Sequence, residues 1–366
     1  MARTRDIFIN GRFLTQNFSG VQRYAREIVL ALDALIAGRP DLRANGCTWN
    51  LVVPQSAGKL PLTTIRTIVS GRSTSHLWDQ TSFAWRARKG VALSLTASGP
   101  VLHPRHIVVI HDAAVFRNAG SFGRAYRTFH QGVDHIFART AQLATVSYFS
   151  RGELADVLGV PARDIIVATN GAEHLAIAPD ETVVGRLGLD QTPFFVMVGN
   201  LTRNKNLAVV VRALNRLKPG CAKLVAVGSF NQSVFGNISL PESPYLVMPG
   251  RLSDAEIAGL MRHARALVFP SLYEGFGIPP LEAMVNGCPV IGSTAGAVQE
   301  VCGTAIDYFD PQDDGKLAEL LARALDDAEG RWRAERIAAG RTRTALYSWQ
   351  ASAQVLAEAC LRLAQG

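Results

Sequence analysis

The strongest constraint on the fold of this chain is a repeating order of short apolar runs and longer helical stretches. The runs are rich in β-branched and aromatic residues, and most are apolar on both sides. Strands of a parallel sheet covered by helices on both faces have this character. Because the order strand, helix, strand recurs in two successive halves of 366 residues, it predicts an α/β protein of two doubly wound, Rossmann-like domains.

Each half supplies six expected strands. In the first half they cover residues 6–10, 49–53, 64–70, 107–111, 143–147 and 165–169. In the second half they cover residues 194–199, 223–228, 245–248, 266–270, 289–292 and 305–309. The main expected helices cover residues 21–35, 122–139, 207–217, 255–264, 316–328 and 349–363.

The net charge of +8 is confined to the first half. Residues 1–180 carry 20 Lys and Arg against 12 Asp and Glu, whereas residues 181–366 carry 18 of each kind. Two interpretations stay open: a solvated basic surface, or a first domain that faces phospholipid headgroups or a phosphate-bearing substrate. Nucleic acid is not expected as a partner, because no nucleic-acid-binding motif accompanies the charge.

Hydropathy and cysteine content indicate the compartment. No apolar run reaches the roughly 18 residues of a spanning helix, and residues 1–6 lack the apolar segment of a signal peptide. The five cysteines are widely spread without a Cys-x-x-Cys pair, which favours free thiols and argues against a structural zinc. We therefore expect a cytoplasmic protein, either free or peripheral on the inner face of the plasma membrane.

The most informative motif is YEGFGIPPLEAM at residues 273–284, which follows an expected strand and leads into a helix. Its glycines permit unusual backbone angles, and Pro280 is expected at the first helical position. Glu274 then lies on the loop and Glu282 in the first helical turn, where unpaired N–H groups suit a diphosphate. The alternative makes Glu274 a surface charge and Glu282 an ordinary first-turn acid, but it does not explain the glycine–proline loop.

With glutamates spaced Glu-x7-Glu inside PSLYEGFGIPPLEAMVNGCPVIGS, this segment resembles the hallmark of the family 4 retaining glycosyltransferases of GT-B fold. The resemblance implies a donor site in the cleft between two Rossmann-like domains and a sugar nucleotide as donor. It assigns the ribose hydroxyls to Glu282. For the transferred sugar it implies Glu274 and the backbone of Gly275, Phe276 and Gly277. Ile278, which follows them, is a further candidate for substrate binding.

Two further motifs of the second half extend the resemblance. The segment VGNLTRNKN at residues 198–206 resembles the family's phosphate-binding loop and implies Lys205 as the main phosphate ligand, with Arg203 beside it. The segment that begins PGRLSDAEI at residue 249 implies that Arg251 and Leu252 lie near the nucleobase. We expect Ser253 there to cap the following helix.

The first half offers two candidates. NFSGVQRYAREIV at residues 17–29 resembles the family's glycine loop, so Gly20 would approach the donor phosphate, although it can also be a plain helix start. VVIHDAAVF at residues 108–116 puts His111 where relatives carry a histidine near the donor sugar, although a lone histidine is more often structural.

The domain limits follow from the order of the expected elements, because the segment after residues 170–171 is variable in character until a fresh strand starts after residue 193. The chain crosses between domains near residues 170–171, and we assign residues 1–175 to an acceptor-binding domain and residues 176–348 to a sugar-nucleotide domain. The last helix, within residues 349–366, is implied to cross back onto the first domain. HLWDQ at 76–80, TVSYFSRGEL at 145–154 and NGAEH at 170–174 serve as fold markers.

The predicted mechanism needs neither a metal nor another cofactor. No Asp-x-Asp triplet is present, so Lys205 and helix N-terminal amides would neutralise the leaving diphosphate. The resemblance implies retention by same-face attack, with the catalytic residues Glu274, His111 and Lys205. A phosphorylase or hydrolase of similar fold and a non-catalytic glycan- or nucleotide-binding subunit are the alternatives.

Donor and acceptor follow from the likeness to bacterial mannosyltransferases. GDP-mannose is the first expectation, with UDP- and dTDP-sugars as alternatives, and the acceptor is a saccharide or lipid-linked saccharide of exopolysaccharide or O-antigen assembly. A membrane contact would use a set of interleaved basic and aromatic residues in the first half. In the alternative, the aromatic side chains pack inward and the arginines are only solvated. The set comprises Trp85, Arg86, Arg88, Lys89, Phe116, Arg117, Phe122, Arg124, Tyr126, Arg127 and Phe129.

Overall fold

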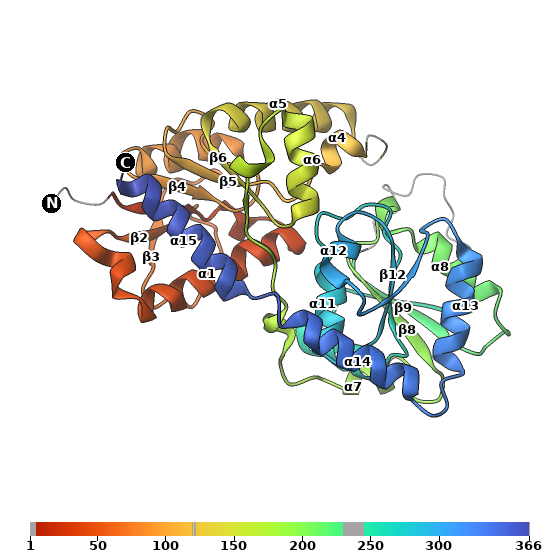
Figure 1. The fold of residues 1–366 in the computed structure, drawn as a ribbon. Helices are drawn as coiled ribbons and strands as arrows, with labels where there is room; N and C mark the ends of the chain where they lie inside the picture. Colours follow the sequence, from red (N-terminus) through yellow and green to blue (C-terminus); the bar gives the residue numbers. More distant parts are fainter. Residues whose placement is uncertain (1–4, 119, 121, 230–244, 366) are drawn as a thin grey trace. The chain divides into compact units, whose positions relative to one another are not determined.

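The last helix of the chain belongs with its first strands in the computed structural model, which describes residues 5–118, 120, 122–229 and 245–365 (Figure 1). Unit 1 comprises Met1–Asn170 and Ser348–Gly366, and unit 2 comprises Gly171–Tyr347. The division falls at residues 170–171, just before the limit of 175 assigned above. Residues 1–4, on which the expectation of no export signal rests in part, lie outside the described residues.

Unit 1 is built on a seven-stranded parallel sheet in the order β3-β2-β1-β4-β5-β6-β7. Its strands are β1 Ile7–Asn10, β2 Trp49–Val53, β3 Arg66–Val69, β4 Val91–Ser94, β5 His106–Val109, β6 Gln142–Thr145 and β7 Ile166–Val167. Its longer helices are α1 Gly20–Gly38, α5 Arg124–Thr140, α6 Tyr148–Leu158 and α15 Trp349–Gln365. Shorter turns of helix are η1 Arg12–Thr15, η2 Pro40–Gly46, α2 His76–Trp78, η3 Asp79–Phe83, α3 Ala84–Ala87, α4 Ala114–Arg117 and η5 Ala162–Asp164.

The sequence does not predict β4, although this strand lies at the centre of the sheet between β1 and β5. The strand is only four residues long, and Ser, Thr and Gly follow it, so no periodic signal marks it. All four of its residues are nevertheless buried. Pairing with two neighbouring strands, rather than local sequence, makes this segment a strand.

Unit 2 is built on a six-stranded parallel sheet in the order β10-β9-β8-β11-β12-β13. Its strands are β8 Phe194–Val198, β9 Lys223–Val227, β10 Leu246–Gly250, β11 Leu267–Phe269, β12 Val290–Ser293 and β13 Asp307–Phe309. Its helices are η6 Glu173–Leu175, α7 Thr182–Arg186, η7 Arg203–Lys205, α8 Leu207–Asn215, α10 Asp254–His263, α11 Ile278–Val285, α12 Val298–Cys302, α13 Asp314–Leu325 and α14 Arg331–Thr344.

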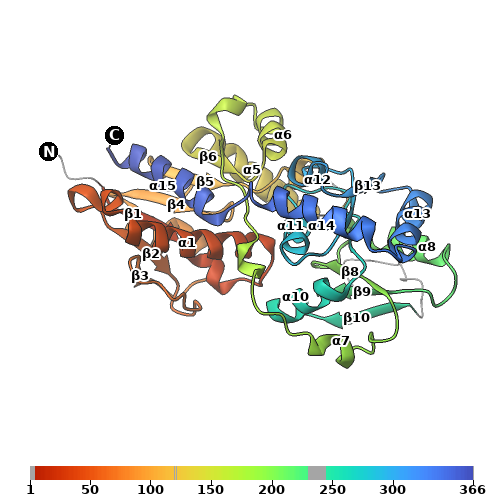
Figure 2. The ribbon, with the colours of Figure 1, turned by 60° about the horizontal axis from the view of Figure 1, so that its bottom comes forward.

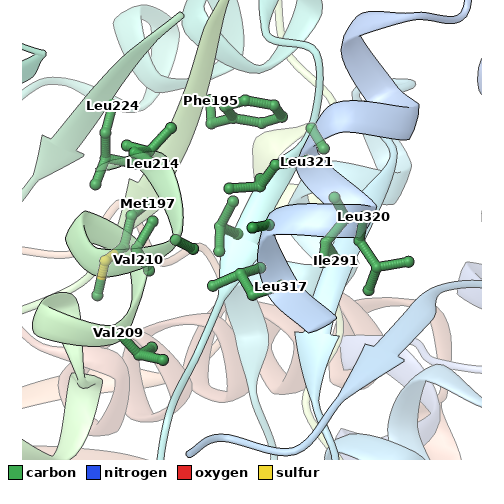
Figure 3. Close-up of a cluster of buried hydrophobic side chains, with 14 of the residues drawn as sticks. Phe195, Met197, Val209, Val210, Leu214, Leu224, Ile291, Leu317, Leu320 and Leu321 are labelled. Atoms are coloured by element: carbon green, nitrogen blue, oxygen red, sulfur yellow. The ribbon is translucent and has the colours of Figure 1, made fainter. Parts of the chain in front are cut away.

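One face of this second sheet is covered by α8 and α13. Side chains alternate along a strand, so every second residue of β8 points to these helices. Burial of each large side chain stabilises the unit by about 1.5–3 kcal/mol. The cluster in Figure 3 includes Phe195, Met197, Val210, Leu214, Leu317 and Leu321.

The closing helix α15 lies along α1 in both ribbon views, as the resemblance implied (Figures 1 and 2). Trp349 at its start meets the ring of Tyr24 on α1 edge-on, with 5.9 Å between the ring centroids. Ser352 donates its hydroxyl proton to the carbonyl oxygen of Thr169 at 2.6 Å. These contacts fasten the C-terminal helix to the same unit as β1.

Candidate functional site

The loop between β11 and α11 carries the glycine–proline motif. Gly277 adopts a φ of +92°, a left-handed conformation that favours glycine, and it immediately precedes α11. The helix therefore begins at Ile278, not at Pro280, and the prolines occupy first-turn positions whose N–H groups would have no helical partner. The expectation that Glu282 belongs to the first turn is wrong for the same reason, since the earlier start moves Glu282 into the following turn.

Lys205 and Glu274 come together from two separate motifs. Lys205 ends η7, the short helix that follows β8, and its Nζ lies 2.5 Å from Oε1 of Glu274. The two side chains are 19% and 14% exposed, so solvent screens this ion pair only partly. The Lys205 ammonium also lies 5.0 Å from the centroid of the Phe269 ring, within range of a cation–π contact.

Asparagines hold the two loops against each other. Leu272 donates its N–H to the carbonyl oxygen of Asn204 at 2.8 Å, and the Asn204 side chain donates to the carbonyl of Tyr273 at 2.8 Å. Asn206 adopts a φ of +52° and donates to the carbonyl of Pro270 at 3.2 Å. Sequence reasoning missed these residues, although asparagine is among the few side-chain-bearing residues that tolerate this conformation.

A glycine from a third loop touches the backbone of Glu274. Gly296 lies between β12 and α12 with a φ of +59°, and a Cβ at this position would lie 2.3 Å from the Glu274 carbonyl oxygen. The neighbouring Ala297 donates its N–H to that oxygen at 2.9 Å. Three loops that follow β8, β11 and β12 thus fix Lys205 and Glu274 at the carboxyl ends of these parallel strands, the edge where α/β sheets bind ligands.

Glu282 has a partner that sequence reasoning treated only as a fold marker. Its Oε1 lies 2.8 Å from Nε2 of His174 in η6, and the two side chains are 10% and 4% exposed. An ionised carboxylate only accepts hydrogen bonds, so His174 donates its Nε2 proton. The sequence signal that could have identified this partner is the NGAEH segment, because no neighbouring residue in the sequence explains the presence of its histidine.

The remaining predicted donor residues also lie in unit 2. Gly275 and Phe276 are buried, and the ring of Phe276 meets that of Tyr347 edge-on at 5.5 Å. Ile278 is half-buried as the first residue of α11. Arg203 on η7 is exposed, and its side chain makes no hydrogen bond with a described residue.

The predicted nucleobase segment follows β10. Arg251 is exposed and Leu252 half-buried, and both lie just before α10. Ser253 accepts the N–H of Glu256, whose carboxylate accepts the N–H of Ser253 in return. The prediction of Ser253 as a helix cap is confirmed.

His111 and Gly20 belong to unit 1. Gly20 is the first residue of α1, as expected for a helix start. His111 follows β5, donates Nε2–H to the carbonyl oxygen of Leu95 at 2.9 Å and meets the Tyr24 ring edge-on at 4.8 Å. Burial lowers the pKa of His111 to about 4, so its imidazole is neutral at pH 7 and Nδ1 is an acceptor.

No group of three or more His, Cys, Asp and Glu side chains in the described part of the chain is placed to hold a metal ion. All five cysteines are free thiols, and four of them are buried. Across residues 5–118, 120, 122–229 and 245–365, none of the helices combines the length and apolar character needed to cross a membrane.

The chain is similar to known proteins in both sequence and fold. The family described as "Glycosyl transferases group 1" matches residues 180–341. The serotype-specific mannosyltransferase WbdA of Escherichia coli is 37% identical over 281 residues, which cover 71% of this chain and 34% of that protein. The O-antigen chain mannosyltransferase B of Escherichia coli is 28% identical over 260 residues, 67% of each chain.

Solved structures share the fold over nearly the full length of the chain. HepE of Anabaena, solved in complex with UDP-glucose, superposes with a TM-score of 0.70 at 18% identity, covering 97% of this chain and 98% of its own. Two parallel α/β sheets and a long closing helix in this arrangement constitute the GT-B fold. The match to WbdA spans only about a third of the length of that relative.

Proposed function

Because this chain carries a group 1 glycosyltransferase domain within a GT-B fold, we propose that it is a retaining glycosyltransferase that uses a sugar nucleotide. More narrowly, it transfers mannose from GDP-mannose to a lipid-linked saccharide in exopolysaccharide or O-antigen assembly. The names of the two Escherichia coli relatives support mannose and, for one of them, an O-antigen chain. The single observation that carries the proposal is the Lys205–Glu274 pair, 2.5 Å long, at the carboxyl edge of the second sheet.

The donor-binding roles follow from the charges at this edge. The Lys205 ammonium is paired with the Glu274 carboxylate, so a diphosphate can compete with that carboxylate for the ammonium. The N-terminus of α11 favours an anion through its partial positive charge, although Pro279 and Pro280 supply no N–H group to it. In this proposal Glu274 and the backbone of 275–278 hold the sugar hydroxyls, Glu282 accepts from the ribose hydroxyls, and Arg251 and Leu252 flank the base.

The proposed chemistry needs only groups of the chain and the two substrates. The bond between the anomeric carbon and the phosphate oxygen breaks, and the acceptor oxygen forms its bond on the same face. The acceptor proton passes to the departing phosphate oxygen, so charge and protons balance. Lys205 stabilises the leaving diphosphate without a metal, a type of stabilisation worth about 3–4 kcal/mol when one preorganised donor is removed.

His111 fits a supporting role toward the transferred sugar. Its Nε2–H is donated to the carbonyl oxygen of Leu95, so Nδ1 of the neutral ring can accept a hydrogen bond from a sugar hydroxyl. A protonated imidazole would instead repel the cationic character that develops at the anomeric carbon. The lowered pKa of His111 therefore favours the chemistry at neutral pH.

Two measurements distinguish the possible donor nucleotides from one another and an enzyme from a non-catalytic binding subunit. GDP, UDP and dTDP are added in turn, and the nucleotide that binds the native state raises the melting temperature most; the UDP-glucose complex of HepE keeps UDP in the panel. Nucleoside diphosphate release is then followed with and without a saccharide acceptor in the wild type and Glu274→Ala. Stabilisation by a nucleotide without any release in the wild type would reject the enzyme and favour a binding subunit.

We further propose that unit 1 contacts an anionic lipid surface. The +8 excess of the first half supports it, and so does Trp85, which is 63% exposed with the Arg88 guanidinium 3.8 Å above its ring. Arg117 is less suited to this role than its sequence suggested, because it is bonded to Glu153 and Asp156. This contact would bring the enzyme to a lipid-linked acceptor.

A further inference from the structure

The residue that carries this inference is His174, a histidine whose side chain is 4% exposed and which lies just after the crossover into unit 2. It donates Nε2–H to Oε1 of Glu282 at 2.8 Å. The Oε2 atom of Glu282 has no hydrogen-bond partner among the described residues, and the side chain retains 10% of its exposure. One oxygen of this carboxylate is therefore held by His174, and the other has no hydrogen-bond partner among the described residues.

A second hydrogen bond fixes the same turn to the same helix. Asn286, one helical turn beyond Glu282, donates its side-chain N–H to the carbonyl oxygen of Leu175 at 3.2 Å and to that of Glu282 at 2.9 Å. The turn η6 is thus attached to α11 at two levels, through His174 and through Leu175. A carboxylate near the start of a helix normally rotates among several side-chain conformers, and this attachment selects one of them.

Burial of the His174–Glu282 pair costs free energy of hydration, which the hydrogen bond between the two side chains must offset. A carboxylate with a tenth of its surface in contact with water loses much of its hydration, and a partner that satisfies one oxygen limits the loss. If the only role of the Glu282 carboxylate were to stabilise the fold, we would expect both of its oxygens to have hydrogen-bond partners. The arrangement leaves an acceptor in a fixed direction, which is what recognition of a hydroxyl group requires.

We propose that His174 is a positioning residue that orients the Glu282 carboxylate toward the ribose hydroxyls of the donor and so makes the site selective for ribonucleotides. The inference rests on the proposed function, in which Glu282 accepts from those hydroxyls. His174 itself touches no substrate. It acts by removing the rotational freedom of Glu282, so that the two hydroxyl bonds form without ordering a side chain first.

The test compares two amides of different reach at position 174. His174→Gln can place an amide N–H where Nε2 lies, whereas the shorter His174→Asn cannot reach Oε1. Dissociation constants of GDP and of 2′,3′-dideoxy-GDP are measured by calorimetry for the full chain. The wild type should prefer GDP by about 10- to 100-fold, the preference expected from hydrogen bonds to a charged acceptor.

The expected pattern is specific to positioning. His174→Gln keeps most of the preference, His174→Asn loses it, and adding Glu282→Gln to His174→Asn causes no further loss. His263→Ala is the matched control, because His263 forms the same kind of pair with Glu181 at 3.1 Å but in an exposed position. That control should retain the wild-type preference, and the melting temperature of each variant shows that it is folded.

Two results overturn the inference, and they differ in what else they overturn. If Glu282→Gln abolishes the preference while His174→Asn retains it, Glu282 binds ribose and His174 is only structural, so the proposed function stands. If Glu282→Gln retains the preference, the donor role of Glu282 fails together with the inference. Where UDP is the nucleotide that stabilises the chain, the same comparison is made with UDP and its dideoxy analogue.

Discussion

Replacing Gly296 by alanine should displace Glu274 without changing the side chain of any residue proposed to bind substrate. The new Cβ would lie 2.3 Å from the carbonyl oxygen and 2.7 Å from the nitrogen of Glu274, both of them backbone atoms. A normal contact needs about 3.5 Å, so the loop must move by about 1 Å. A displacement of this size at a reacting centre lowers turnover by about 10²-fold.

Gly287→Ala is the control that separates the steric clash with Glu274 from the conformational strain of alanine at a positive φ, which both substitutions share. Gly287 has a φ of +68°, close to the +59° of Gly296, but nothing lies within 4 Å of a Cβ there. Each alanine should destabilise unit 2 by about 1–2 kcal/mol because of the left-handed conformation. That corresponds to a fall in melting temperature of about 2–8 °C for a domain of this size.

The assay is nucleoside diphosphate release from GDP-mannose, together with a thermal melt of both variants. Gly287→Ala should lose stability and keep its turnover below the melting transition. Gly296→Ala should lose at least as much stability and, in addition, turn over about 10²-fold more slowly. Equal turnover in the two variants would refute the argument that Gly296 keeps Glu274 in place.

Activity should survive excess EDTA, because the sequence lacks an Asp-x-Asp triplet; loss of turnover restored only by Mg²⁺ or Mn²⁺ would contradict this. Lys205→Ala should slow turnover by about 10²-fold, since a preorganised charge on the leaving diphosphate is lost. Unchanged turnover would move that role to Arg203 or Arg251. Vesicles with anionic lipid should co-sediment the full chain at low salt but not at high salt, and Trp85→Ala with Arg88→Ala should weaken this binding by about 1 kcal/mol per basic residue removed. No binding at low salt would exclude the membrane contact.

Local sequence was sufficient for most of the elements. Parallel strands buried on both faces read as continuous apolar runs, and twelve expected strands correspond to strands of the two sheets. The Ser253 cap was predictable because both of its hydrogen bonds connect residues three apart. In contrast, β4 and the polar helix α14 depend on neighbours: Gly340 of α14, for instance, packs so closely on α11 that a Cβ would lie 2.9 Å from the Met284 side chain.

The candidate site divides in the same way. The glycine–proline loop and the lysine loop could be recognised from the sequence, because each is marked by glycine, proline or charged residues at a fixed local spacing. The contacts between side chains of different motifs could not be predicted, because the Lys205–Glu274 and His174–Glu282 contacts join residues 69 and 108 positions apart. The sequence by itself determined which side chains can carry charge and where the backbone can turn. Only the tertiary structure decided which of them pair, since a distance between distant residues depends on the order of strands in a sheet, and no local preference encodes that order.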